Sequence, residues 1–183
     1  NLQRGVASSS LLADVFVAKL NTDGSQAYTV MFGGTNLDEG WDLAVDVAGQ
    51  AHVVGETYST NFPTLGTGEF LHATNSGSAD VFVSVLNSSG TAFVRSAMLG
   101  GSLNDLGYGL KLDAAGDDYL VGRTYSTNFP RLAPFITTLG GTNDAFIAKI
   151  GVEPSLNISG AGNDVLVTWQ AYGFQLQANT NVV

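Results

Sequence analysis

The feature that most constrains the fold is an internal repeat. Residues 13–63 return as residues 79–130, at an offset of 66 residues in the first motif and 67 in the later ones. The hexapeptide at 58–63 is identical to the one at 125–130. A fixed period of this length, rich in short apolar segments, is typical of propellers and repeat arrays whose units pack on their neighbours.

Each repeat contains four segments with the alternating, β-branched and aromatic pattern of strands. The predicted strands are residues 14–20, 27–32, 41–47 and 51–57 in the first copy, and 80–86, 92–99, 108–112 and 118–124 in the second. Turn signals such as Asp23-Gly24 separate them, and no segment sustains a helical period. Gly33-Gly34 and Gly100-Gly101 are expected to end strands, each pair with at least one residue of positive φ. The sequence therefore predicts an all-β fold of four-stranded antiparallel propeller-type blades.

The order of the strands within the period decides how they group into blades. If the hairpins that begin at Trp41 and Tyr108 are inner pairs, residues 13–34 form an outer half, 40–99 a complete blade, and 106–150 most of another. A propeller needs about four blades to close. The sequence thus predicts about two blades and a fraction, an incomplete propeller unless oligomerisation completes it.

The chain divides into repeat and non-repeat segments. The predicted divisions are an N-terminal lead-in at 1–12, repeat one at 13–78, repeat two at 79–143, the start of a third repeat at 144–150, and a C-terminal β segment at 151–183. Together 13–150 is the repeat region. The C-terminal segment predicts three strands, at 155–159, 164–169 and 174–178. Because the blade count is fractional and this segment is short, we expect both ends to be cut from a longer chain or completed by neighbours.

The order of the motifs resembles a known bacterial repeat. The strings DVFVAKLNTDG, MFGG and GWDLAVDVAGQAHVVGETYSTNFP are similar to the SBBP-type β-propeller repeat, and the resemblance covers nearly all of 13–150. It implies an extracellular or bacterial cell-surface protein with many blades and no defined catalytic activity. The string VLVTWQAYGFQLQANTN resembles the opening of a fibronectin-like or Ig-like module, which normally runs to about 100 residues.

Composition excludes several classes of function. The net charge is −9 with only seven Lys and Arg, and no basic stripe exists, so we expect no nucleic-acid partner. The chain has no Cys, which excludes thiolate metal sites and a Cys nucleophile. No apolar run approaches the ~20 residues of a membrane helix, so membrane insertion is not expected.

Carboxylates recur at fixed stations of the repeat, after the paired glycines and at strand starts. A repeated acid beside a turn is most often a cap that bonds its own backbone. The alternative is a Ca²⁺ site, because Ca²⁺ takes several carboxylate and carbonyl oxygens. The candidate metal ligands are Asn36, Asp38, Glu39 and Asp42.

The identical hexapeptides supply a second set of candidate residues. Their rings and amides form either a wedge between blades or a surface for a glycan. Because every blade needs the same wedge, identity between the copies favours packing. The candidate ligand residues are Tyr58, Asn61, Phe62, Tyr125, Asn128 and Phe129.

The sequence offers no catalytic constellation. His52 aligns with Tyr119 and is expected to fill an aromatic strand position, and His72 has no counterpart in the second copy. No Gly-x-Ser-x-Gly motif occurs. We therefore expect a non-catalytic extracellular or cell-surface structural or interaction protein that self-assembles as a homo-oligomer or filament, or that joins further blades of a longer chain. The alternatives are a multivalent, lectin-like carbohydrate-binding module and a fragment of a larger secreted enzyme.

Overall fold

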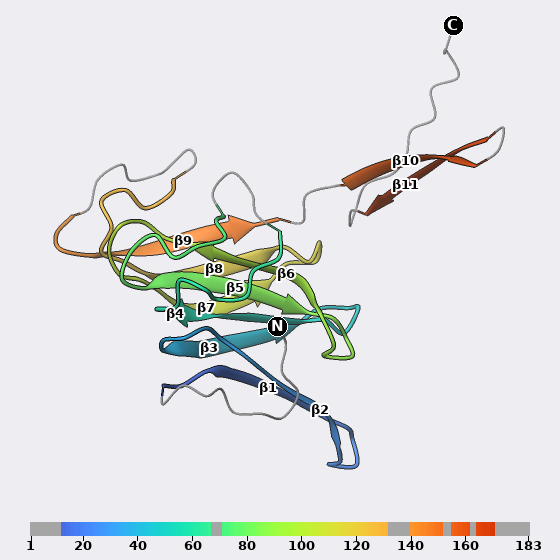
Figure 1. The fold of residues 1–183 in the computed structure, drawn as a ribbon, viewed down its shortest axis with the longest axis horizontal. Helices are drawn as coiled ribbons and strands as arrows, with labels where there is room; N and C mark the ends of the chain where they lie inside the picture. The colour runs from blue at the N-terminus through green and yellow to red at the C-terminus, as the bar shows by residue number, and fades with distance from the viewer. Residues whose placement is uncertain (1–11, 67–70, 132–139, 152–154, 162–163, 171–183) are drawn as a thin grey trace, which may run out of the picture.

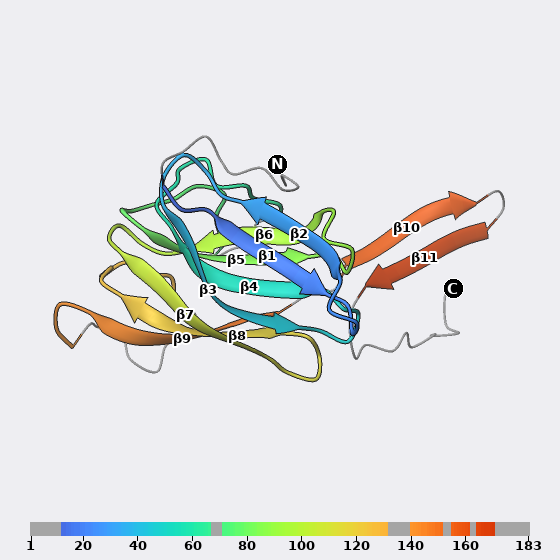
Figure 2. The same cartoon turned by 90° about the horizontal axis from the view of Figure 1, so that it is seen from below.

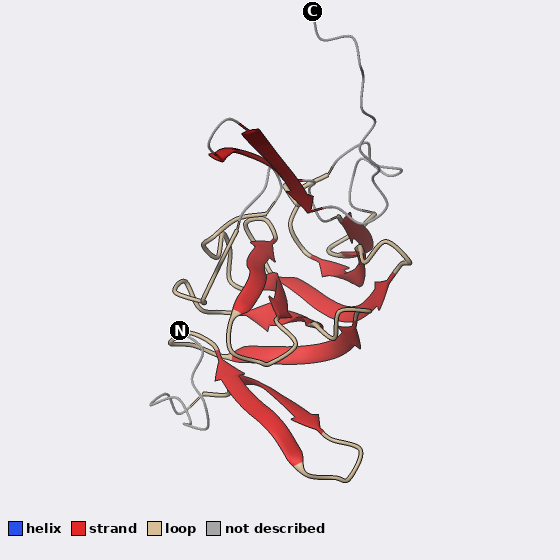
Figure 3. Cartoon of the chain, turned by 90° about the vertical axis from the view of Figure 1, so that its right-hand side faces the viewer, coloured by secondary structure: helices blue, strands red, loops and turns tan. Residues whose placement is uncertain are grey.

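The computed structural model describes residues 12–66, 71–131, 140–151, 155–161 and 164–170. The regular secondary structure of these residues consists of β-strands alone (Figures 1 and 3). The prediction of an all-β chain is confirmed for this part. No helix that could cross a membrane occurs in the described residues. The strands are β1 (Val15–Leu20), β2 (Gln26–Phe32), β3 (Asp38–Val45), β4 (Ala51–Thr57), β5 (Asp80–Leu86), β6 (Phe93–Leu99), β7 (Asp105–Leu112), β8 (Asp118–Thr124), β9 (Asp144–Ile150), β10 (Ser155–Ala161) and β11 (Asp164–Gln170).

Every strand pair is antiparallel and joins consecutive strands, and the strands form four sheets. β3–β4–β5–β6 is a four-stranded sheet, β7–β8–β9 is a three-stranded sheet, and β1–β2 and β10–β11 are hairpins. Figures 1 and 2 show the β3–β6 sheet lying between the β1–β2 hairpin and the β7–β9 sheet. Short turns explain the hairpins β1–β2, β3–β4, β5–β6 and β7–β8, because two strands joined by a few residues readily fold back on each other. β4 pairs with β5 and β8 with β9 across the longer connections at 58–79 and 125–143.

A sheet and a sequence repeat are different units in this protein. Repeat one supplies β1 and β2 to one sheet and β3 and β4 to the next. The sheets contain the strands that the phasing grouped together, with 13–34, 40–99 and 106–150 in three separate sheets. The side chain of Asp42 links the β3–β6 sheet to the β7–β9 sheet, since its Oδ2 accepts a hydrogen bond from Leu110 N–H at 2.8 Å.

Burial along each strand follows the position of its sheet in the stack. In β1, Val15 and Val17 are buried and Phe16 is exposed, and in β9 Phe146 is buried while Ile147 is exposed. This alternation is the one that the sequence predicts for a sheet with one covered face. Every residue of β4 and β5 is buried instead, because the β3–β6 sheet is covered on both sides.

Aromatic rings fill the two spaces between the sheets. Phe32 of β2 meets Phe82 of β5 edge to face at 6.1 Å between centroids, and Phe62 stacks on Phe82 at 4.8 Å. In the second space Phe129 contacts Phe146 of β9 at the same 4.8 Å. The phenylalanine of each hexapeptide therefore packs against the phenylalanine at the same station of the next strand pair.

The paired glycines correct one expectation. Gly33-Gly34 and Gly100-Gly101 follow β2 and β6, as predicted, but the positive φ expected in each pair is wrong, since positive φ occurs at other glycines. Close approach explains the glycines instead. A Cβ at Gly34 would lie 2.3 Å from the Cβ of Ser59, and at Gly101 a Cβ would lie 2.5 Å from the Cβ of Ser126.

The C-terminal segment forms a hairpin of its own. The strands predicted at 155–159 and 164–169 are β10 and β11, which pair with each other through seven residues each. The strand predicted at 174–178 and residues 1–11 of the predicted lead-in lie outside the described residues.

Candidate functional site

The recurring aspartates cap loops. Each accepts a hydrogen bond from the backbone N–H four residues before it, which closes the loop that leads into the next strand. These bonds run from Gly34 to Asp38 (2.6 Å), Ser76 to Asp80 (2.7 Å), Gly101 to Asp105 (2.6 Å) and Gly140 to Asp144 (2.8 Å). The repetition of the carboxylate follows from this shared geometry.

The hexapeptide loop binds the glycine loop through the same aspartate. Ser59 Oγ donates to Asp38 at 2.9 Å and accepts from Asn36 N–H at 2.9 Å. Asn61 Oδ1 accepts from the backbone N–H of Thr35 at 3.0 Å. The second copy repeats every bond, from Ser126 to Asp105 (2.8 Å), Leu103 to Ser126 (2.8 Å) and Ser102 to Asn128 (2.9 Å).

Four of the six candidate ligand residues are thus engaged within the fold. The side-chain oxygens of Asn61 and Asn128 hold the neighbouring loop, and Phe62 and Phe129 are buried in the cores. Tyr58 and Tyr125 are half-buried and follow β4 and β8 directly. Only these two tyrosines leave ring surface available to a ligand.

The four candidate calcium ligands have separate roles. Asp38 is fully buried, with Thr57 and Ser59 as hydroxyl donors. Asp42 is occupied by backbone N–H groups, and Asn36 donates to the carbonyl of Tyr58 at 2.9 Å. Glu39 lies across the β3–β4 pair from Glu56. Among the described residues, no group of three or more His, Cys, Asp or Glu is placed to hold a metal ion.

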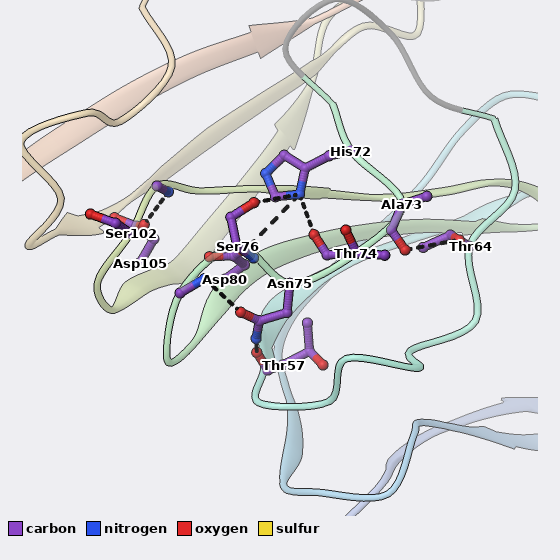
Figure 4. A network of polar contacts seen from close by, with 12 residues as sticks. Thr57, Thr64, His72, Ala73, Thr74, Asn75, Ser76, Asp80, Ser102 and Asp105 are labelled. Atoms are coloured by element: carbon purple, nitrogen blue, oxygen red, sulfur yellow. Dashed lines mark hydrogen bonds and ion pairs between the residues drawn. The ribbon is translucent and has the colours of Figure 1, made fainter.

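His72, Ser76 and Asp80 lie together without the geometry of a catalytic triad (Figure 4). His72 Nδ1–H donates to the carbonyl of Thr74 at 2.6 Å. Ser76 Oγ and Asp80 Oδ2 approach that same nitrogen at 3.4 and 3.8 Å. A triad needs the hydroxyl and the carboxylate on opposite ring nitrogens, so this cluster has no activated nucleophile.

Asp80 is expected to make the protein more stable at mildly acidic than at neutral pH. Burial raises the pKa of Asp80 from 3.8 to about 6, with Asp105 adding to the rise and Ser76 and His72 opposing it. Between these pH values the folded chain holds a proton that the unfolded chain releases. The free energy of unfolding therefore falls as pH rises from about 4 to about 6.

Urea unfolding across this pH range tests the expectation. Asp80→Asn keeps an acceptor for Ser76 and removes the titration, so its stability should fall less steeply with pH. Burial also raises the pKa of Asp38 and Glu56, so part of the slope should remain. An unchanged slope in the variant would show that Asp80 does not carry the effect.

His52 belongs to a buried polar cluster that joins two sheets. Its position in β4 matches that of Tyr119 in β8, as expected, but it acts as a hydrogen-bonding group rather than as an aromatic ring. His52 Nδ1 lies 2.7 Å from Asp118 Oδ1, and Asp118 Oδ2 pairs with the guanidinium of Arg95. His52 Nε2 faces Asp46 Oδ2 at 3.6 Å. The cluster connects β4 and β6 of the four-stranded sheet to β8 of the three-stranded one.

Two aromatic residues with exposed rings were not predicted as site residues. Trp41 and Tyr108 are the extra residues of β-bulges in β3 and β7, where the pairing register shifts past them. Their rings meet edge to face at 6.4 Å. The signal that could have identified them is an aromatic residue between two positions occupied by glycine or aspartate in both copies, as in Gly40-Trp41-Asp42.

The fold defines a class of protein, an all-β chain of stacked antiparallel sheets built from a sequence repeat. No protein-family model matches the chain, and a search of curated proteins finds no significant match. Function therefore has to be argued from this geometry.

Proposed function

We propose that the chain is a non-catalytic structural or interaction protein of the extracellular space or cell surface, built from propeller-type repeats and associating through its end sheets. The resemblance to bacterial propeller repeats supports the location and the blade arrangement. The single observation that carries the association concerns equivalent apolar positions of the repeat. These positions are exposed in the two end sheets of the stack and buried in the middle sheet.

The outer surface of the β1–β2 hairpin is the N-terminal end face, which comprises Phe16, Leu20 and Met31. Phe16 is 67% exposed, whereas Phe82, at the same station of the middle sheet, is 0% exposed. Leu20 is exposed and its equivalent, Leu86, is fully buried. Apolar burial contributes about 25 cal/mol per Å², so covering these side chains would be favourable.

The outer surface of the β7–β9 sheet is the C-terminal end face, which comprises Tyr119, Val121 and Ile147. Ile147 is 79% exposed, whereas Val83, at the same station of the middle sheet, is 1% exposed. Val121 is exposed and its equivalent, Val54, is fully buried. Both ends of the stack thus expose apolar stations of the kind that the middle sheet buries.

The interior of the stack indicates how such faces combine. The Phe82 face of the middle sheet packs on Val15, Val17 and Phe32 of the β1–β2 hairpin. The N-terminal end face consists of residues equivalent to those of the Phe82 face, with Phe16 in the position of Phe82. The C-terminal end face consists of residues equivalent to those of the Val15 and Val17 face, with Ile147 in the position of Val17. Association is therefore head to tail, and it yields rings if the rotation closes and filaments if it does not.

Light scattering over a range of protein concentrations tests the proposal. We expect the mass to rise above the 19.0 kDa of one chain. Phe16→Lys and Ile147→Lys should each weaken association at least tenfold, because either charge would be buried without a partner. Val94→Lys is the matched control, since Val94 is exposed on β6 of the middle sheet and lies on neither end face.

Mixing the two charged variants distinguishes head-to-tail association from a symmetric dimer. Phe16→Lys retains an intact C-terminal end face and Ile147→Lys retains an intact N-terminal one. An equimolar mixture should give a heterodimer that grows no further. Each variant alone should form no dimer. A mass of one chain at every concentration, or equal loss in the Val94→Lys control, would overturn the proposal.

A further inference from the structure

The two β-bulges of the repeat each place an aromatic ring on the surface. In β3 the pairing moves from Gly40 to Asp42 and leaves Trp41 as the extra residue, and in β7 it moves from Gly107 to Gly109 and leaves Tyr108. A bulge re-aims one side chain at the cost of regular pairing, and bulges are over-represented beside functional sites. In both copies of the repeat, the residue that interrupts the regular strand pairing is aromatic.

The two rings form a corner open to solvent. Trp41 is 53% exposed and Tyr108 is 44% exposed, and their planes meet at 82°. The edge of the Trp41 ring is fixed, because Nε1–H donates to Glu56 Oε2 at 3.3 Å. The ring faces remain free of the two cores, and an exposed Trp oriented by a buried carboxylate is unusual for a side chain that serves packing alone.

A tyrosine follows the end of the fourth strand of each repeat, Tyr58 after β4 and Tyr125 after β8. Tyr58 lies two residues after Glu56, which holds Trp41, and its backbone N–H donates to the carbonyl of Leu37 at 2.9 Å, beside Glu39. Burial raises the pKa of Tyr58, and Glu56, Glu39 and Tyr108 raise it further. Tyr125 accepts a hydrogen bond at its hydroxyl from Arg123 at 2.9 Å, and Arg123 also lies over its ring. We call Trp41, Tyr58, Tyr108 and Tyr125 the ring row.

The polar residues beside the ring row differ between the two copies. Glu56 of the first copy is replaced by Arg123 in the second, and Glu39 is replaced by Leu106. The hexapeptides of the two copies are identical, and their hydrogen bonds and buried phenylalanines explain that identity. The ring row keeps its aromatic character in both copies, while one neighbouring acid is replaced by a base and the other by a leucine. That pattern favours an extended ligand contacted by both repeats.

We propose that the ring row binds a linear neutral oligosaccharide. The C–H faces of pyranose rings stack on aromatic rings, and their hydroxyls both donate and accept hydrogen bonds. Glu39 and Glu56 provide acceptors and Arg123 provides donors along one surface. A cationic ligand would meet Arg123, and an anionic one would meet the two glutamates. The proposal is independent of self-association, because the ring row includes none of the end-face residues.

Calorimetric titration with a panel of neutral hexaoses tests this site, using the β-1,4-glucan, β-1,3-glucan, β-1,4-mannan and β-1,4-N-acetylglucosamine hexamers as probes. The titrations use the Ile147→Lys background, so that association does not contribute heat. We expect at least one hexaose to bind. Trp41→Ala and Tyr108→Ala should each weaken that binding about tenfold or more, and Tyr108→Phe should retain it, because the ring supplies the stacking surface.

A spectroscopic readout separates the site from general effects on folding. The chain has two Trp residues, so Trp169→Phe leaves Trp41 as the only indole. Its fluorescence should shift with the same hexaose that releases heat. Val94→Ala is the control, since Val94 is an exposed apolar residue on β6, at the opposite edge of the four-stranded sheet from Trp41, and it should bind normally. Binding to none of the hexaoses, equal loss in Val94→Ala, or displacement of the hexaose by tetramethylammonium would overturn the proposal.

Discussion

Replacing Asp118 with asparagine is expected to lower the free energy of unfolding by about 3–5 kcal/mol, the cost of removing one partner from a buried ion pair. Asp118 is fully buried and serves both His52 and Arg95. The amide has one oxygen and carries no charge, so it cannot accept from both His52 and Arg95 as the carboxylate does, and the Arg95 guanidinium loses its counter-charge. Urea denaturation followed by fluorescence measures the change.

The neighbouring residue provides the control for this variant. Asp117 pairs with Lys149 at 2.9 Å on a partly exposed surface. Such pairs contribute about 0–1 kcal/mol, so Asp117→Asn should have little effect on the free energy of unfolding. A loss below about 1 kcal/mol in Asp118→Asn would mean that the cluster of His52, Asp118 and Arg95 adds little to the stability of the sheet packing. Against a total stability of about 5–15 kcal/mol, the expected loss is large.

Replacing Gly55 with alanine is expected to cost about 3 kcal/mol or more, at the upper end of the range for overpacked cores. A Cβ at Gly55 would lie 1.9 Å from the carbonyl oxygen of Glu39 and 2.7 Å from the ring of Phe82. The nearest atom belongs to the backbone of the paired strand, so β3 and β4 would have to separate. Thermal and urea unfolding should both show the loss.

The repeat supplies a second test of the same geometry. Gly122 is the equivalent of Gly55, and a Cβ there would lie 2.1 Å from the carbonyl oxygen of Leu106. Gly122→Ala should therefore be destabilising to a similar degree. Gly141→Ala is the control, because no atom lies within 4 Å of the added Cβ. A stable Gly55→Ala variant with normal cooperativity would contradict the close approach.

Local pattern predicts much of the strand structure and little of the side-chain bonding. Alternation of Val15, Phe16 and Val17 predicts both the strand and its one-sided burial, because the period of a strand is fixed by its backbone. The same pattern at β5 does not reveal that both faces are covered. That outcome depends on sheets contributed by residues far along the chain.

The glycines illustrate where sequence reasoning assigns the wrong cause. Gly33-Gly34 ends β2 as the pattern predicts, and positive φ is the usual reason for glycine at such a position. The actual reason is the side chain of Ser59, which follows the next strand pair and approaches Gly34 closely. Contact with a residue 25 positions away leaves no local trace in the sequence.

The candidate sites were only partly predictable for the same reason. Repetition identified Asn61 and Phe62, but repetition is produced equally by a shared fold and by a shared ligand, and the hydrogen bonds assign both residues to the fold. Trp41 was missed, because a bulge is defined by the pairing register of two strands. His52 appeared to be an isolated histidine until the neighbouring sheet placed Asp118 beside it.

The sequence by itself determines the strands and the tight antiparallel hairpins, because these depend on alternation and on short turns between neighbouring segments. The phasing of the repeat predicts the grouping of the strands into sheets, which turn length does not, since the short connection at 33–37 joins two different sheets. Only the tertiary structure decides which face of each sheet is covered, which aspartates become buried partners of His52, Arg95 and Thr57, and which aromatic rings remain outside. The physical reason is range. Backbone geometry acts between adjacent residues, whereas the pairing of His52 with Asp118 joins residues 66 positions apart, and each core groups residues from distant strands.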